Sequence, residues 1–170
     1  MSYIELSFDE NKNLFSIPVI LTRKVDKPQY GSVSQFKASH HINEVMYIDT
    51  GSSLSSITQG IADKLSIDVN SLTLSEVGGI GGITMIPVTD DIIIIVGSND
   101  SQFKEIKLDK IAVNPDNLTK KIKKGKGAFK QRGESSTPMF ALCGLDALAQ
   151  MGGKLILDIR NKEGRIEFSN

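Results

Sequence analysis

The segment "YIDTGSS" (Tyr47–Ser53) contains the residue best suited to catalysis, Asp49. Asp is disfavoured in strands, and a carboxylate beside a buried strand is unfavourable unless it is hydrogen-bonded. One explanation is local: Asp49 caps the backbone in an Asx turn, and Gly51 supplies the turn conformation. The other explanation is catalytic. It requires a second carboxylate, which a copy of Asp49 across a two-fold axis would supply.

Two Asp49 carboxylates held close together cannot both be ionised, so the pair would share one proton. The ionised member would take a proton from a water molecule that attacks a peptide carbonyl, and the protonated member would assist the departing amine. An activated nucleophile is not expected, because Cys143 lies in an apolar run typical of a buried thiol. The pair His40–His41 has no third ligand at a metal-binding spacing, so we expect no metal and no cofactor.

Two further segments have the character of a cleft-forming site. The run "VGGIGGITMIPV" places Gly78–Gly82 between two apolar strands, which predicts a hairpin whose backbone can approach a ligand. A phosphate cradle is the alternative for this run, but it lacks the Lys-Ser/Thr pair and the following helix of a P-loop. The apolar segment "MFALC" then reaches Gly144, where a short helix is expected to begin.

The remaining elements are mostly strands. Helical spacing of apolar residues is confined to Thr58–Ile67 and Gly144–Gly152. The pattern "KLILDIR…RIEFSN" predicts a C-terminal hairpin around "NKEG", with Gly164 in a positive-φ position. Other runs rich in Ile, Val, Leu and Thr predict strands at Leu14–Thr22, Val45–Ile48, Ser71–Val77, Ile83–Val96, Gln102–Val113 and Met139–Leu142.

Length and charge limit the possible functions. We expect one domain over residues 1–170, with loop insertions at about 23–43 and 119–136. The 20 basic and 20 acidic residues balance, so nucleic acid is not the expected partner, and RNA binding through the Lys-rich insertion is a weaker alternative. Met1–Phe8 lacks the apolar stretch of a signal peptide, and the longest apolar run, Ile92–Val96, is too short to span a bilayer, so neither a signal peptide nor a membrane span is expected. The single Cys fits a reducing compartment. We therefore expect a cytoplasmic protein without membrane contact.

Taken together, three motifs resemble one family. The Asp-Thr-Gly turn, the Gly-Gly-Ile-Gly-Gly hairpin and the apolar–apolar–Gly-x-Asp step stand in the order found in the retroviral-type aspartic proteases, or retropepsins. The resemblance spans roughly Val45 to Asp158. It implies an all-β fold: a closed or partly open retropepsin-like β-barrel with one or two short helices and a flap hairpin. It also implies a homodimeric aspartic endopeptidase that cuts extended polypeptides.

The resemblance assigns a role to each matched residue. Asp49 would be catalytic, Thr50, Gly51 and Ser52 would support the pair of carboxylates, and Gly144 with Asp146 would form the strand-to-helix motif. The flap and substrate-binding residues would be Gly78, Gly79, Ile80, Gly81 and Gly82. Ser52 replaces the family's common Ala, and we expect its hydroxyl to hydrogen-bond the Asp49 oxygens and to favour an acidic optimum.

The chain also departs from the retropepsin pattern. Leu145 stands where the family usually has Arg, and Ser53 stands where the family has the Asp that pairs with this Arg. Because both partners of that ion pair are absent together, no charge is left unpaired, and the chemistry is less affected than the way the dimer is fixed. A non-catalytic peptide-binding or dimerisation module that kept the fold is the alternative function.

Overall fold

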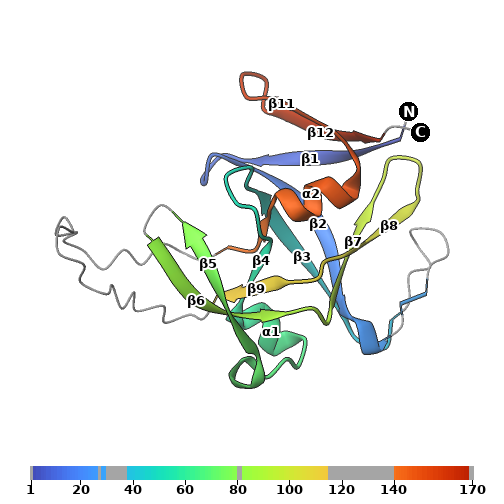
Figure 1. Ribbon diagram of the computed structural model, residues 1–170. Coiled ribbons are helices and arrows are strands. Elements are labelled where there is room, and N and C mark those ends of the chain that lie inside the picture. The colour runs from blue at the N-terminus through green and yellow to red at the C-terminus, as the bar shows by residue number, and fades with distance from the viewer. Residues whose placement is uncertain (1, 27, 30–37, 80–81, 115–139, 169–170) are drawn as a thin grey trace, which may run out of the picture.

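The computed structural model describes residues 2–26, 28–29, 38–79, 82–114 and 140–168, and strands make up most of them (Figure 1). The two α-helices are α1 (Gln59–Lys64) and α2 (Leu145–Met151), and two 3-10 turns are η1 (Lys24–Asp26) and η3 (Val69–Ser71). Among these described residues, no helix is long and apolar enough to cross a membrane. The strands are β1 (Tyr3–Asp9), β2 (Leu14–Arg23), β3 (His41–Ile48), β4 (Ser56–Thr58), β5 (Thr73–Gly79), β6 (Gly82–Thr89), β7 (Ile92–Gly97), β8 (Phe103–Lys107), β9 (Ile111–Asn114), β10 (Leu142–Cys143), β11 (Gly153–Asp158) and β12 (Glu163–Phe168).

The strands form one hydrogen-bonded sheet that does not close into a barrel. Its order is β11-β12-β1-β2-β3-β10-β4-β9-β6-β5, and β7 joins it by pairing with both β2 and β8. Most neighbours are antiparallel, but β10 runs parallel to β3 and β4 runs parallel to β9. The expected all-β fold with two short helices is confirmed, in the partly open form.

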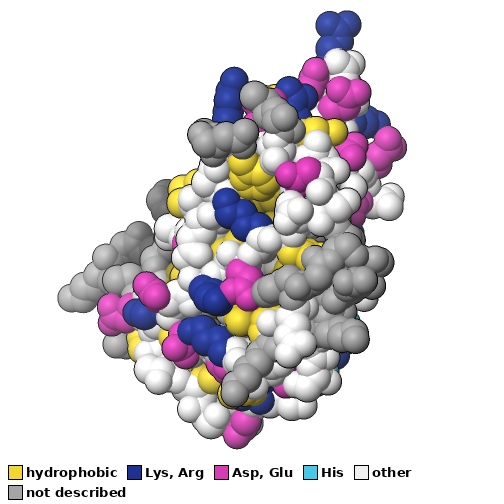
Figure 2. All heavy atoms as spheres, turned by 90° about the vertical axis from the view of Figure 1, so that its right-hand side faces the viewer, with side chains coloured by type: hydrophobic (Ala, Val, Ile, Leu, Met, Phe, Trp, Pro, Cys, Tyr) yellow, Lys and Arg dark blue, Asp and Glu magenta, His cyan; other side chains and the backbone are white. Residues whose placement is uncertain are grey.

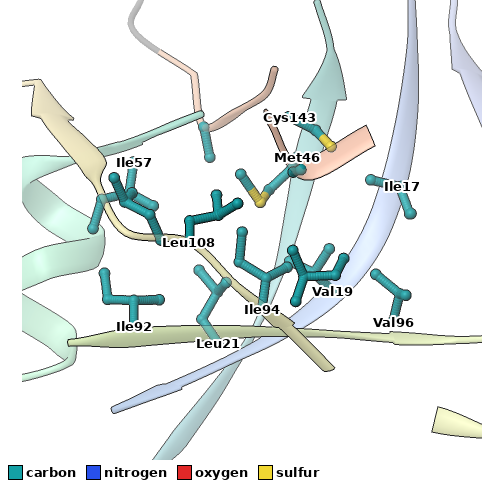
Figure 3. Close-up of a cluster of buried hydrophobic side chains, with 14 of the residues drawn as sticks. Ile17, Val19, Leu21, Met46, Ile57, Ile92, Ile94, Val96, Leu108 and Cys143 are labelled. Atoms are coloured by element: carbon teal, nitrogen blue, oxygen red, sulfur yellow. The ribbon is translucent and has the colours of Figure 1, made fainter. Parts of the chain in front are cut away.

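The core is formed by one face of the paired strands β2 and β7, together with side chains from the other strands and from both helices. Ile92, Ile94 and Val96 of β7 meet Leu21 of β2 in a cluster of fully buried side chains (Figure 3). All five apolar residues of β7 are buried, as a strand covered on both faces requires. Burial of such side chains contributes about 1.5–3 kcal/mol each, so this packing is a main source of stability for the sheet.

Both helices lie where the sequence predicts them. The Thr58 hydroxyl accepts a hydrogen bond from the Ile61 N–H at 3.3 Å and caps α1. Gly144 precedes α2, and Gly152 ends it in the left-handed conformation at φ 64°. Residues adjacent in the sequence therefore determine the start of α1 and the end of α2. The buried side chains of Ile61 and Met151 pack these helices against the sheet.

The run Ile83–Val96, predicted as one strand, is two. The chain turns at Asp90–Asp91, where the Asp91 carboxylate accepts a hydrogen bond from Arg23 Nε at 2.7 Å. This ion pair fixes a corner that apolar periodicity does not reveal. The run Gln102–Val113 is likewise divided into β8 and β9, and the strand expected at Met139–Leu142 is the two-residue β10.

The C-terminal hairpin forms as predicted, from β11 and β12. The prediction that Gly164 adopts a positive φ is wrong: Lys162 adopts it, at φ 59°, and Gly164 lies within β12. A Cβ at Gly164 would lie 2.9 Å from the Phe15 ring, so this glycine provides room for an aromatic side chain. The insertion predicted at 119–136 lies outside the described residues.

Candidate active site

Asp49 emerges from the sheet where β3 ends beside β10. Leu142 pairs with Tyr47 and Cys143 with Ile48, in parallel register. The Asp49 N–H extends this ladder by donating to the Cys143 carbonyl at 3.1 Å. Ile48 is buried and Asp49 is half-buried, so the carboxylate lies at the boundary between the core and the surface.

The turn after Asp49 is held by hydrogen bonds to Asp49 itself. The Gly51 N–H donates to Asp49 Oδ1 at 2.9 Å, as expected, and the Ser52 N–H donates to the Asp49 carbonyl at 3.2 Å. A Cβ on Gly51 would lie 3.2 Å from Asp49 Oδ1, which leaves little room for any other residue. The local Asx-turn geometry is therefore present, and it also orients the carboxylate. Thr50 and Gly51 are exposed at the tip of the turn.

The Ser52 hydroxyl does not do what the sequence suggested. It donates to the Leu54 carbonyl at 2.7 Å, within its own loop. A hydroxyl has one proton to donate, so the expected hydrogen bond to the Asp49 oxygens is not formed. Ser52 therefore shapes the loop that follows Asp49.

A second set of hydrogen bonds fastens this loop to the start of α2. Asp146 accepts from the Ser55 hydroxyl at 2.6 Å and from the Ser55 N–H at 3.0 Å. The Ser55 hydroxyl also accepts from the Gly144 N–H at 3.0 Å, and the Leu145 N–H donates to the Ser52 carbonyl at 2.8 Å. Gly144 and Asp146 thus position the Asp49 loop through their hydrogen bonds to Ser55, and none of these bonds involves Asp49 itself.

Ser55 is the site residue that sequence reasoning missed. It is fully buried, and it connects Asp146 and Gly144 through one hydroxyl. Nothing in the run "SSLSS" distinguishes it from its exposed neighbour Ser53. The only signal is indirect: a predicted Gly-x-Asp step at a buried helix start needs polar partners for its carboxylate.

Gly144 has no space for a side chain. A Cβ there would lie 2.8 Å from the Leu54 carbonyl carbon and 2.9 Å from its oxygen. These are backbone atoms, so they cannot move aside by a change of rotamer. The close approach of the two loops, and with it the position of Asp49, depends on a glycine at this point.

The segment predicted to form a flap lies in the hairpin of β5 and β6. Gly78 pairs with Ile83 and Gly79 with Gly82, while Ile80 and Gly81 at the predicted tip lie outside the described residues. The hairpin is anchored to the rest of the sheet through β6 and β9. In Figure 1 the hairpin projects to the left, and its strand β5 is the last strand in the order of the sheet.

Other candidate chemistry is limited. Cys143 is buried, and burial raises the pKa of its thiol to about 12, with a smaller contribution from the nearby charge of Asp146. A neutral buried thiol is not a nucleophile. Within the part of the chain that the structure describes, no group of three or more His, Cys, Asp or Glu residues is placed to hold a metal ion.

Comparison with known proteins places the fold. No family model matches the sequence, and no curated protein matches it either. Among solved structures, the chain is similar to a retropepsin-like aspartic protease from Rickettsia conorii, with a TM-score of 0.56 and 14% sequence identity. The match covers 99% of this chain and 92% of the other. The fold is therefore that of a retropepsin-like aspartic protease.

Proposed function

We propose that the chain is an aspartic endopeptidase that acts as a homodimer, with Asp49 of each copy forming the catalytic pair. The observation that carries this proposal is the position of Asp49: half-buried, in an Asp-Thr-Gly turn, at the end of β3 on a retropepsin-like fold. The Gly51 N–H and the loop held by Asp146 support the same orientation of the carboxylate.

A second copy is needed because one chain supplies one such turn. Asp49 lines neither of the two cavities of about 330 and 460 Å³ that described residues form, so neither cavity serves as a cleft beside this carboxylate. An aspartic mechanism requires two carboxylates that share a proton, and a two-fold axis beside the Asp49 turn provides them from identical chains. Thr50, exposed at the tip, then faces the second copy.

The mechanism is general acid–base catalysis with water as the nucleophile. The ionised carboxylate takes a proton from a water molecule while the oxygen of this water bonds to the peptide carbonyl carbon. The protonated carboxylate gives its proton to the carbonyl oxygen. The tetrahedral intermediate then breaks its C–N bond, and the amine leaves with a proton from the pair. No covalent enzyme intermediate forms. An extended polypeptide is the substrate, held by main-chain hydrogen bonds from the β5–β6 hairpin.

The test is cleavage of a mixed peptide library from about pH 3 to pH 7.5, the range in which a pair of carboxylates exchanges its proton. Wild type is compared with Asp49→Asn and with the control Asp109→Asn, which changes an exposed carboxylate between β8 and β9. We expect cleavage by wild type and by the control, and none by Asp49→Asn. Equal cleavage by all three proteins would show that Asp49 is not catalytic. A folded dimer that cleaves nothing would favour a peptide-binding module.

A further inference from the structure

Met85 is an exposed methionine on the hairpin of β5 and β6. Its side chain is 51% exposed, whereas Met46 in β3 and Met151 in α2 are both fully buried, at 0%. Peroxides oxidise the thioether sulfur of methionine to a sulfoxide, and an exposed sulfur meets the oxidant more readily than a buried one. Among the methionines that the structure describes, the fold therefore leaves only Met85 open to this chemistry.

Met85 lies in a part of the sheet that is only two strands wide. β6 pairs with β9 at Val88 and Thr89, and among the described residues the rest of β6 pairs with β5 alone. Figure 1 shows these two strands projecting away from the body of the sheet. A two-stranded hairpin is marginally stable by itself, and Pro87 weakens this one further because proline supplies no backbone N–H. Side-chain contacts between the two strands therefore matter for its stability.

Two residues of β5 are the cross-strand neighbours of Met85. Glu76 is directly opposite Met85, and Leu74, which is opposite Pro87, is diagonal to it on the same face. Both positions are within reach of a long side chain such as methionine. Leu74 is 54% exposed, so the body of the sheet does not cover this face of the hairpin. The apolar thioether of Met85 is therefore suited to the apolar side chain of Leu74.

A sulfoxide at Met85 would have poor neighbours. Oxidation makes the side chain polar and adds an oxygen that accepts hydrogen bonds. The side chains of Leu74 and Pro87 have no donor, and a carboxylate at Glu76 only accepts. Donors are common elsewhere: Figure 2, which shows the side of the molecule away from the hairpin, has Lys and Arg side chains spread among acidic ones. Oxidation of Met85 therefore removes an apolar contact and gains no side-chain hydrogen bond from these three neighbours.

We propose that Met85 is a modification site for hydrogen peroxide, and that its sulfoxide loosens the β5–β6 hairpin. The sulfur attacks one peroxide oxygen, and an S–O bond forms as the O–O bond breaks. The departing hydroxide takes the proton from the transferred oxygen and becomes water. The sulfur loses two electrons, and the peroxide gains them. A thiol-dependent methionine sulfoxide reductase reverses the change, so the hairpin carries a reversible redox switch.

The effect of this switch on peptide cleavage rests on the proposed function. In that proposal the β5–β6 hairpin holds an extended polypeptide by main-chain hydrogen bonds, so a looser hairpin holds the substrate less well. Oxidation is expected to lower cleavage about twofold to fivefold, the factor that corresponds to the loss of one cross-strand contact. Cys143 does not compete for peroxide, because burial raises the pKa of its thiol to about 12 and the thiolate is the reactive form.

The first part of the test treats the full chain with hydrogen peroxide at neutral pH and follows each methionine by peptide mass spectrometry. Met46 and Met151 are internal controls, because both are fully buried in the same molecule. Met85 is expected to form its sulfoxide at least about tenfold faster than either of them. The matched variant is Met85→Leu, which keeps a similar apolar volume and removes the sulfur.

The second part measures amide hydrogen exchange in β5 and β6, together with peptide cleavage, before and after peroxide. Each protein is compared with its own untreated sample, so a change in basal activity caused by Met85→Leu does not enter the result. Exchange in the hairpin of wild type is expected to become about twofold to fivefold faster, and treatment with the reductase and a dithiol is expected to restore it. Met85→Leu is expected to show no change with peroxide.

The outcomes separate this inference from the proposed function. Oxidation of Met85 at the same rate as Met46 and Met151 overturns the modification site. Hairpin exchange that is unchanged in oxidised wild type, or that rises equally in Met85→Leu, overturns the switch, and both results leave the protease proposal standing. A wild type that cleaves no peptide before oxidation contradicts the protease proposal, and hydrogen exchange still decides whether Met85 controls the hairpin.

Discussion

The carboxylate of Asp146 and the fully buried Ser55 are joined by two hydrogen bonds, one from the hydroxyl at 2.6 Å and one from the backbone N–H at 3.0 Å. Asp146 also accepts from the Ala147 N–H at 2.7 Å. Ser55 belongs to the loop after Asp49, and Asp146 belongs to the first turn of α2. This pair therefore ties the candidate catalytic turn to the C-terminal part of the chain. Asp146 directly follows Leu145, the residue that stands where the retropepsin pattern usually has an Arg.

Asp146→Asn is expected to lower the free energy of unfolding by about 1–3 kcal/mol, because an amide nitrogen replaces one of the oxygens that Ser55 donates to. Peptide cleavage falls as the Asp49 loop loosens. Denaturant unfolding and cleavage rates measure the two effects. Ser55→Ala is expected to give a similar loss of stability, and the double variant less than the sum, since both act on one network. Strict additivity would show that the two residues act separately.

Gly144→Ala is expected to destabilise the fold by at least about 2 kcal/mol, because its Cβ would press on the Leu54 backbone at 2.8 Å. Gly97→Ala is the matched control. A Cβ on Gly97 meets nothing within 4 Å, so this change is expected to be neutral or slightly stabilising. Thermal or urea unfolding compares the two. Equal stability of both variants would contradict the close approach of the Leu54 and Gly144 loops.

Ser52→Ala is expected to leave the pH dependence of peptide cleavage unchanged. The hydroxyl donates to the Leu54 carbonyl, so its loss removes about 1 kcal/mol of loop stability and no bond to Asp49. The pH–rate profiles of wild type and variant, measured at the same fraction of dimer, decide the matter. A shifted optimum in Ser52→Ala would mean that the hydroxyl turns toward Asp49 in the dimer.

Asp9 makes stability depend on pH in the acidic range. Hydrogen bonds from the Lys12 ammonium and then the Tyr47 hydroxyl lower the pKa of Asp9 from 3.8 to about 2. Because the folded pKa lies below the unfolded one, this contribution is complete above pH 3.8 and is lost as the pH falls toward 2. Asp9→Asn is therefore expected to be less stable than wild type at pH 6, and the difference shrinks at pH 2.5. Urea unfolding at both pH values measures it, and a constant difference would refute the prediction.

The sequence predicted what is local. Apolar periodicity and caps gave both helices, because Thr58 and Gly152 act within a few residues of chain. The three motifs around Asp49, Gly78–Gly82 and Gly144 gave the retropepsin-like fold, because each is a turn whose residue types are strongly restricted. The C-terminal hairpin followed from alternating residues in β11 and β12.

What the sequence did not predict depends on partners distant along the chain. The break at Asp90–Asp91 is fixed by Arg23, and the role of Gly164 by the Phe15 ring. The Ser52 hydroxyl has two candidate acceptors at short range, and only the folded loop shows that it donates its hydrogen bond to the Leu54 carbonyl. Ser55 is recognisable only once Asp146 lies beside it.

β10 is two residues long, and its place between β3 and β4 affects how the protein is made. Asp49 leaves the ribosome long before Leu142 and Cys143, which complete the ladder next to it. Asp146, which fastens the Asp49 loop, is made later still. A growing chain therefore lacks the hydrogen bonds that fasten the Asp49 turn until α2 has been synthesised. The proposed peptide cleavage therefore requires that α2 has emerged from the ribosome and folded against the Asp49 loop.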